Sequence, residues 1–377
     1  MTTHYDVAVI GGGIVGLANA WMAAKRNLKV LLLERTSVAQ GASVRNFGMI
    51  WPVGQPAGEL HDIALRSRNY WLELSEAGAI DLETCGSLHL AHNDDEWAVL
   101  EEFASLGTFG VQLLTPAETC ERSPLVNPVG LCGALWSDSE IRVHPRTASA
   151  KIAHWLTETQ NVDCRFKTPV VGIDDGEVIA ADGTRWSAEK ILVCSGSDLQ
   201  TLYPDVFATS GLKLCKLQML KSVSQPGLPS NLPHIASGLT LRHYASFEVC
   251  PSLQQLKTRI AEQTPELDRY GIHVMASTFP QGQIILGDSH EYDEAITPFD
   301  STEIDDLMLR ELRKVICLND WEIAERWHGI YSKHPEVPIF SATPEPNVHI
   351  LVGPGGAGMT MSFGLAERAW NQTIGAT

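Results

Sequence analysis

The chain has 377 residues, of which 44% are hydrophobic, and its 45 acidic and 28 basic residues give a formal net charge of −17. This length suits two domains or one large two-lobed enzyme with a substantial core. The negative charge argues against nucleic acid as a partner, and no apolar run approaches the roughly 20 residues that span a membrane. The first predicted strand begins at Tyr5, which leaves no room for a secretory signal. We therefore expect a cytoplasmic protein without a membrane span.

The N-terminal segment 5–34 carries the most specific motif of the chain. Its pattern predicts a strand, a glycine-rich turn, a helix and a second strand, in that order. Gly11, Gly13 and Gly16 follow the apolar run Val7–Ile10 at the G-x-G-x-x-G spacing. Gly11 permits the tight turn, Gly13 lets the backbone approach a pyrophosphate, and Gly16 lets the helix pack against the strand. This pattern predicts a binding site for an adenine dinucleotide.

The helix and the second strand of this segment add two further features of such a site. Ile14 and Val15 open the helix, whose free N–H groups and positive dipole end favour phosphates. Glu34 ends the second strand, where it can accept hydrogen bonds from ribose hydroxyls, and Arg35 follows it. These neighbours distinguish the motif from an isolated G-x-G-x-x-G sequence.

The rest of the chain alternates helical and extended patterns. Periodic apolar spacing predicts helices at 58–77, 94–106, 145–160, 300–317 and 361–373. Apolar runs predict strands at 168–173, 177–181, 190–194 and 348–352, and several more within 211–292 around an irregular middle. Nucleotide-domain signals thus occur at the start, the middle and the end of the chain. We expect a discontinuous cofactor domain with a mostly antiparallel lobe inserted between its pieces.

The eight cysteines offer no obvious chemistry. They are scattered, with no C-x-x-C pair and no spacing typical of metal ligands. We interpret them as reduced, mostly buried thiols, and we expect neither a structural disulfide nor a metal site.

Five blocks occur in the order found in one enzyme family. They are VIGGGIVGL ending in Glu34-Arg35, GASVRNFGMI at 41–50, VHPRT at 143–147, KILVCSGSDL at 190–199, and WHGI with VHILVGPGGAGMT within 327–360. Over nearly its whole length the chain thereby resembles the flavin-dependent amine oxidoreductases of the D-amino-acid oxidase and glycine oxidase type. The resemblance implies an α/β fold with an FAD-binding Rossmann-like domain formed by 1–84, 143–206 and 326–377. An inserted, mostly antiparallel β-sheet substrate domain would comprise 85–142 and 207–325.

The resemblance also implies which residues line the flavin. Gly353 opens a glycine-rich turn before the final helix, which can aim N–H groups at the flavin N1/C2 carbonyl region, where negative charge accumulates on reduction. Arg45, inside the 41–50 loop, could serve the flavin, the substrate or a fixed turn. Gly329 stands near the position where some relatives carry a flavin-linking cysteine, so we expect non-covalent FAD. The expected contacts are Ser43, Asn46, Gly48, Met49, Val170, Ser195, Gly196, Gly355, Gly356, Ala357, Gly358, Met359 and Thr360.

The substrate end departs from the glycine oxidase pattern. There an arginine that pairs with the substrate carboxylate occupies the place of Tyr331, and Lys333 follows two residues later. Here a tyrosine hydroxyl and an ammonium replace the bidentate guanidinium of the arginine. Such single donors suit a tetrahedral phosphonate. Tyr331 could also serve packing alone, and Lys333 could be a solvated surface lysine. Further candidates for the substrate site are Arg242, His243 and Tyr244 on an apparent strand edge, and Trp51 and Gln55 after the flavin loop.

Segments such as ASVRNFGMIWPVGQPAGELHDIALRSR and LCKLQML resemble one subgroup, a flavoenzyme clade associated with bacterial breakdown of aminophosphonates. This resemblance implies oxidation of 2-aminoethylphosphonate or an N-methyl or hydroxy derivative by hydride transfer to flavin N5, without a dedicated side-chain base. Oxygen or another electron acceptor would complete the cycle, and Ile285 takes the place of a lysine that serves oxygen in some relatives. The alternatives are a glycine, sarcosine or D-amino-acid oxidase, a nicotinamide-dependent dehydrogenase, and a nucleotide-binding module without redox chemistry.

Overall fold

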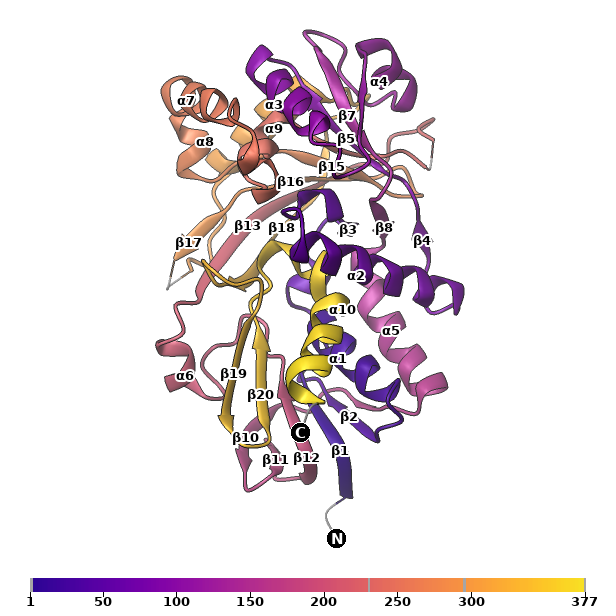
Figure 1. Ribbon diagram of the computed structural model, residues 1–377, viewed down its shortest axis with the longest axis vertical. Coiled ribbons are helices and arrows are strands. Elements are labelled where there is room, and N and C mark those ends of the chain that lie inside the picture. Colours follow the sequence, from indigo (N-terminus) through magenta and orange to yellow (C-terminus); the bar gives the residue numbers. More distant parts are fainter. Residues whose placement is uncertain (1–2, 230, 294–295, 376–377) are drawn as a thin grey trace.

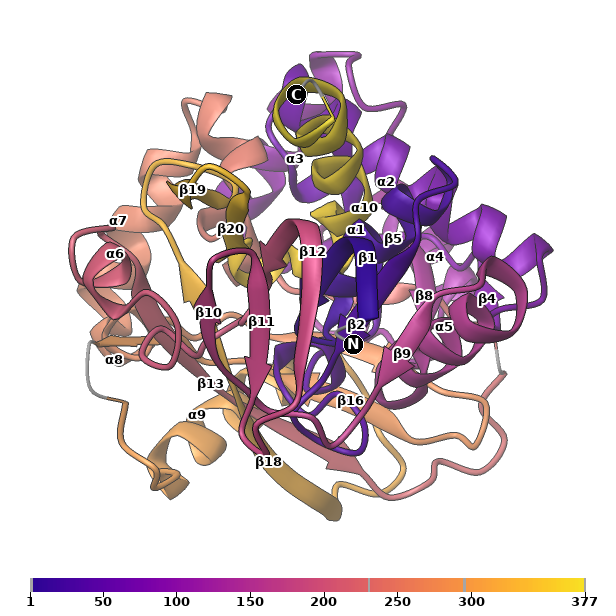
Figure 2. The same cartoon turned by 90° about the horizontal axis from the view of Figure 1, so that it is seen from below.

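The computed structural model describes residues 3–229, 231–293 and 296–375. An eight-stranded sheet forms the lower half in Figure 1 and is seen from below in Figure 2. Its central strands β1 (Thr3–Ile10), β2 (Val30–Leu33), β12 (Arg185–Val193) and β20 (Val348–Val352) are parallel where they pair. The remaining strands are β9 (Asp163–Arg165), β10 (Val170–Asp174), β11 (Glu177–Ala180) and β19 (Phe340–Glu345). Near-continuous Val, Ile and Leu runs in the central strands match a sheet that is buried on both faces.

Four helices pack together beside this sheet: α1 (Ile14–Ala24), α2 (Glu59–Glu76), α5 (Pro145–Gln160) and α10 (Gly358–Ala369). The fully buried Trp21 and Phe363 rings meet edge to face, with centroids 5.5 Å apart, and Trp71 joins them. A Cβ atom at Gly364 would lie 2.2 Å from the carbonyl oxygen of Ile63, so only glycine permits this approach of α10 to α2. The final helix begins at Gly358 rather than at 361, because the glycine-rich turn already adopts helical backbone there.

A nine-stranded sheet forms the upper half. Its longest pair is β13 (Lys213–Ser222) with β18 (Ile323–Lys333), and its one parallel pair joins β5 (Ser87–Ala91) to β14 (His234–Ala236). The other strands are β6 (Gln112–Leu114), β7 (Gly133–Ser137), β15 (Met275–Thr278), β16 (Ile284–Gly287) and β17 (Glu291–Asp293). Three short strands form a small third sheet: β3 (Met49–Ile50), β4 (Leu82–Glu83) and β8 (Ile141–Val143). The α/β fold with an inserted, mostly antiparallel lobe is thus confirmed.

The upper half differs from the expectation in two respects. The supposedly irregular middle contains α7 (Leu253–Gln263) and α8 (Pro265–Arg269), and α7 buries Leu253, Leu256 and Ile260 on one face. The whole of β18 belongs to the nine-stranded sheet, although the expected domain boundary at 325/326 divides it. The domain limits themselves stay a prediction. The remaining helices are α3 (Asp94–Ser105), α4 (Pro116–Arg122), α6 (Pro204–Ala208) and α9 (Thr302–Val315). Within the described ranges, no helix combines the length and apolar character that crossing a membrane requires.

Candidate active site

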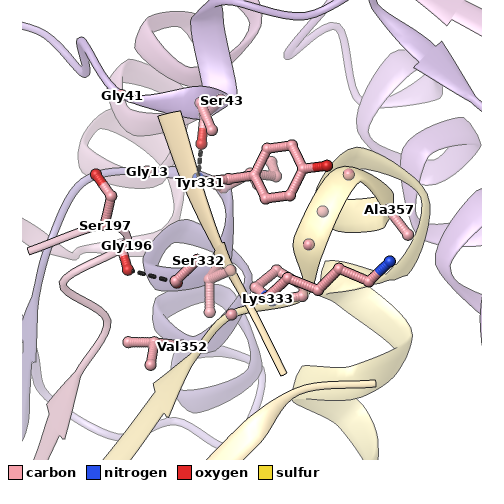
Figure 3. Close-up of a pocket in the computed structure, with 18 of the residues that line it drawn as sticks. Gly13, Gly41, Ser43, Gly196, Ser197, Tyr331, Ser332, Lys333, Val352 and Ala357 are labelled. Carbon is pink, nitrogen blue, oxygen red and sulfur yellow. Dashed lines mark hydrogen bonds between the residues drawn. The ribbon is translucent and has the colours of Figure 1, made fainter. Parts of the chain in front are cut away.

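A cavity of about 690 Å³ lies where the two large sheets meet. Its walls come from the turn after β1, the loop 39–56, strand β18 and the glycine-rich segment 353–361. Figure 3 shows this junction: Tyr331 and Lys333 project from β18 toward the turn that carries Ala357, while Ser43 approaches Gly13 from the loop. Segments that are distant in the sequence therefore line one cavity.

Each glycine of the N-terminal turn serves a different structural role. Gly11 adopts a φ of +112°, and a Cβ atom there would lie 2.3 Å from the carbonyl oxygen of Cys194. A Cβ atom at Gly16 would lie 1.9 Å from the carbonyl oxygen of Gly11, so Gly16 serves the contact of helix and turn and does not line the cavity. Gly13 does line it. This division of roles is the one that the motif predicts.

Glu34 is buried at the end of β2 and holds the turn in place. Its Oε2 accepts a hydrogen bond of 2.7 Å from the Gly12 N–H, and its Oε1 accepts from the backbone and hydroxyl of Thr36. Each carboxylate oxygen can accept a further bond, which leaves capacity for a ribose hydroxyl. The neighbouring Arg35 forms an ion pair with Asp198 at the cavity wall.

The 41–50 loop is fixed by its own polar side chains. Ser43 Oγ accepts a hydrogen bond of 2.9 Å from the Ile14 N–H at the start of α1, as Figure 3 shows. Asn46 bridges the loop by donating to the carbonyl of Ala42 and accepting from the Gly48 N–H. Gly48 itself lies outside the cavity lining, because its contact is with the β8 backbone, where a Cβ atom would lie 2.1 Å from the carbonyl of Val143. The expected flavin contact of Gly48 is therefore replaced by a packing contact.

Most of the other expected cofactor residues converge on the cavity. Arg45 lines it and donates to the carbonyl of His328 on β18, at 3.1 Å. Ser332 on the same strand donates to the carbonyl of Gly196, at 2.8 Å. The lining also includes Ile14, Val15, Met49, Val170, Ser195 and the run Gly355–Thr360.

The residues of the N-terminal turn and of its neighbouring segments fit a bound FAD. Gly13 and the start of α1 offer backbone N–H groups, and Glu34 offers carboxylate oxygens. Two buried polar atoms at the cavity, Ser195 Oγ and Trp51 Nε1, have no hydrogen-bond partner among the described residues. A polar ligand would satisfy such atoms.

Tyr331 and Lys333 stand at the far end of the cavity, on β18. Tyr331 is buried, and burial raises the pKa of its phenol well above the usual value, so the hydroxyl keeps its proton and can donate a hydrogen bond. The Lys333 ammonium lies 5.7 Å from the centre of the Tyr292 ring, and Lys333 is exposed. Both residues therefore line the cavity, and the Tyr331 hydroxyl also interacts with Cys215 and Tyr292.

An aromatic wall closes the same end. The rings of Trp51 and Tyr244 stack with centroids 6.1 Å apart and an angle of 25° between their planes. Burial raises the pKa of Tyr244, whose hydroxyl lies 3.5 Å from the Met275 sulfur. Gln55 lies beside this wall and also lines the cavity.

Arg242 lies elsewhere. Residues 238–242 form a 3-10 helix and not a strand edge, and the Arg242 guanidinium binds Asp268 and the carbonyls of Leu239 and Ile272. It lines a separate surface hollow and not the main cavity, whereas its neighbour His243 lines both.

Three residues that the sequence analysis did not select, His273, Asp288 and His290, line the cavity beside His243. Burial lowers the pKa of His290 to about 4 and lowers those of His243 and His273 well below the usual value, while it raises that of Asp288. They come from segments with no common motif, so only the fold brings them together.

Comparison with known proteins places this geometry in context. The family described as FAD dependent oxidoreductase matches residues 6–370. The chain is 29% identical to a glycine oxidase of Geobacillus kaustophilus over 212 residues, which cover 52% of this chain and only 56% of that protein. It is 28% identical to a monomeric sarcosine oxidase of a Bacillus species over 213 residues, covering 52% of each of the two chains. A glycine oxidase structure from Bacillus cereus superposes with a TM-score of 0.77 at 19% identity, over 98% of this chain and 97% of that one.

Proposed function

We propose that this chain, which belongs to the DAO family of FAD-dependent oxidoreductases, oxidises a small amine that carries an anionic group. The observation that carries the proposal is the composition of the far end of the cavity. There the buried Tyr331 and the Lys333 ammonium, both from β18, line the same cavity as the stacked rings of Trp51 and Tyr244. Family membership favours this enzyme class over a nicotinamide-dependent dehydrogenase and over a nucleotide-binding module without redox chemistry.

The chain would act mainly by orienting the amine and excluding water. When bound, FAD supplies the two-electron acceptor, because its N5 takes a hydride. Trp51 and Tyr244 would pack against the carbon chain of the amine, and the Tyr331 hydroxyl would donate to its anionic oxygen. As a hydride leaves the carbon, the nitrogen lone pair of the neutral amine forms the C=N bond. Water then hydrolyses the resulting iminium to an aldehyde, releasing ammonia or methylamine and a proton.

The substrate that we propose is 2-aminoethylphosphonate or an N-methyl or hydroxy derivative. The resemblance to an aminophosphonate-associated subgroup supports it, as does Tyr331 in the place of the carboxylate-binding arginine. A phosphonate accepts hydrogen bonds in more directions than a planar carboxylate, so it suits single donors such as a phenol and an ammonium. The second candidate is oxidation of glycine, sarcosine or a D-amino acid, which the names of the glycine and sarcosine oxidase relatives support.

Anaerobic bleaching of the flavin absorption distinguishes these candidates. Purified holoprotein is mixed with aminoethylphosphonate, its N-methyl derivative, glycine, sarcosine or D-alanine, with ethylamine as the control that lacks an anionic group. We expect the phosphonates to bleach the flavin faster than the amino acids, and ethylamine to bleach it slowest. Bleaching by the amino acids alone would rule out the phosphonate substrate, and equal bleaching by ethylamine would rule out recognition of an anion.

A further inference from the structure

Three histidines from separate segments converge at the Tyr331 end of the cavity. His243 follows the 3-10 helix 238–242, His273 precedes β15, and His290 lies between β16 and β17. One ring nitrogen from each lies within 4.8 Å of the others. The ring centroids are 3.9 Å apart for His243 and His273, and 4.4 Å apart for His243 and His290. Such an arrangement brings three potential lone-pair donors to one point.

The polar atoms of this cluster are not satisfied by the protein. Both ring nitrogens of His273 and Oδ1 of Asp288 are buried without a hydrogen-bond partner among the described residues. These side chains are only 2% and 6% exposed, respectively. Nε2 of His273 lies 3.5 Å from Oδ1 of Asp288, beyond a good hydrogen bond. Buried polar groups are normally paired, so these atoms indicate a ligand.

The hydrogen bonding of His290 defines which of its nitrogens is free. Nδ1 lies 3.2 Å from the carbonyl oxygen of Gly271. A carbonyl can only accept, so Nδ1 carries the proton and Nε2 presents a lone pair. That Nε2 lies 3.9 Å from Oδ2 of Asp288, which also accepts. A backbone carbonyl that fixes the tautomer in this way is the usual outer support of a metal-binding histidine.

We propose that His243, His273 and His290 bind a divalent transition-metal ion such as Zn²⁺, with Asp288 available as an oxygen ligand. Imidazole nitrogens with one carboxylate are typical ligands of Zn²⁺ and Fe²⁺, whereas Mg²⁺ and Ca²⁺ prefer oxygen alone. The rings of His290 and Tyr331 have centroids 6.4 Å apart, so the ion would share the substrate end of the cavity. The ion would coordinate the anionic group of the amine as a further ligand. This role rests on the proposed function.

Titration of the FAD-loaded protein with ZnCl₂, after treatment with a chelator, tests the site without any substrate. Calorimetry is expected to find one Zn²⁺ per chain, bound at least roughly tenfold more weakly by the His273→Gln and His290→Gln variants. The exposed His154, on α5 and outside the cavity, supplies the control variant His154→Gln, which is expected to bind as the unsubstituted chain does. Absence of saturable binding, or equal binding by all variants, would overturn the proposal.

Two measurements on the unsubstituted protein cover the case of a variant that does not fold. Cobalt(II) is expected to give the visible ligand-field bands of a four- or five-coordinate ion, and a spectrum like that of the hydrated ion would overturn the metal assignment. Binding of inorganic phosphate by the metal-free protein, unchanged by added Zn²⁺, would overturn it too and make the cluster a simple anion site. Flavin bleaching, in contrast, tests the amine substrate, so either idea can fail alone.

Discussion

The contact between α1 and the N-terminal turn gives the sharpest prediction. In Gly16→Ala, the new Cβ would lie 1.9 Å from the carbonyl oxygen of Gly11, whereas real Cβ contacts essentially never fall below 3.0 Å. The helix and the turn must therefore separate by about 1 Å, and neither atom belongs to a flexible side chain. Overpacking of this kind costs about 1–3 kcal/mol of folding free energy.

The same displacement moves the N–H groups that would face the pyrophosphate of FAD. We expect Gly16→Ala to bind FAD at least about tenfold more weakly, a loss of about 1.4 kcal/mol. Quenching of flavin fluorescence measures the affinity, and urea unfolding of the apoprotein measures the stability. Gly172→Ala is the matched control, since a Cβ atom there meets only Ile179 Cδ1 at 3.8 Å. An unchanged FAD affinity in Gly16→Ala would refute the role assigned to this packing contact.

Three further predictions concern the substrate end, the flavin linkage and acid stability. Tyr331→Phe keeps the buried ring but removes one hydrogen-bond donor. Because a hydrogen bond to a charged group contributes about 1.5–3 kcal/mol, the dissociation constant of the anionic amine is expected to rise at least about tenfold. The dissociation constant of ethylamine is expected to stay unchanged, and an equal loss of affinity for both amines would contradict hydrogen bonding to the anion. Acid or heat denaturation is expected to release all yellow colour from the polypeptide, and colour that stays bound would disprove non-covalent FAD. Burial raises the pKa of Asp198, but hydrogen bonds from Thr201, Arg35 and two backbone N–H groups outweigh it and hold the pKa at about 2. Because the folded pKa is lowered, this carboxylate stabilises the fold above its unfolded pKa of about 4 and loses that contribution between about pH 4 and pH 2. In Asp198→Asn, the free energy of unfolding is expected to fall less steeply over this pH range. An unchanged pH dependence would contradict the role of Asp198 in acid stability.

The cofactor half of the site could be predicted from the sequence because its signals are local. The glycine spacing after β1 and the carboxylate that ends β2 lie within one 30-residue unit, and backbone geometry dictates both. The final glycine-rich turn is also visible in the sequence, since its glycines directly precede the predicted final helix. Gly48 was misjudged because its positive φ of +74° serves the contact with β8, which no local pattern reveals.

The polar end of the substrate site could not be predicted in the same way. Asp288 and His290 share the connection between β16 and β17, whereas His273 precedes β15, and the pairing of β15 with β16 brings the two segments together. Arg242 differs from the expectation because the apparent strand edge at 242–244 is a 3-10 helix over 238–242 followed by a turn. Helix α7 was missed because its polar outer face masked the buried positions Leu253, Leu256 and Ile260. Long-range pairing, and not residue type, decides these positions.

Strand β18 has a consequence for the interpretation of kinetics. It supplies Tyr331 and Lys333 to one end of the cavity, yet its His328 carbonyl holds Arg45 and its Ser332 holds the backbone at Gly196. A substitution on this strand therefore changes two equilibria together, the binding of the coenzyme and the binding of the substrate. An apparent Michaelis constant measured for such a variant would mix both. Saturation with the coenzyme must be verified first, and only then does a raised Michaelis constant reflect weaker binding of the substrate.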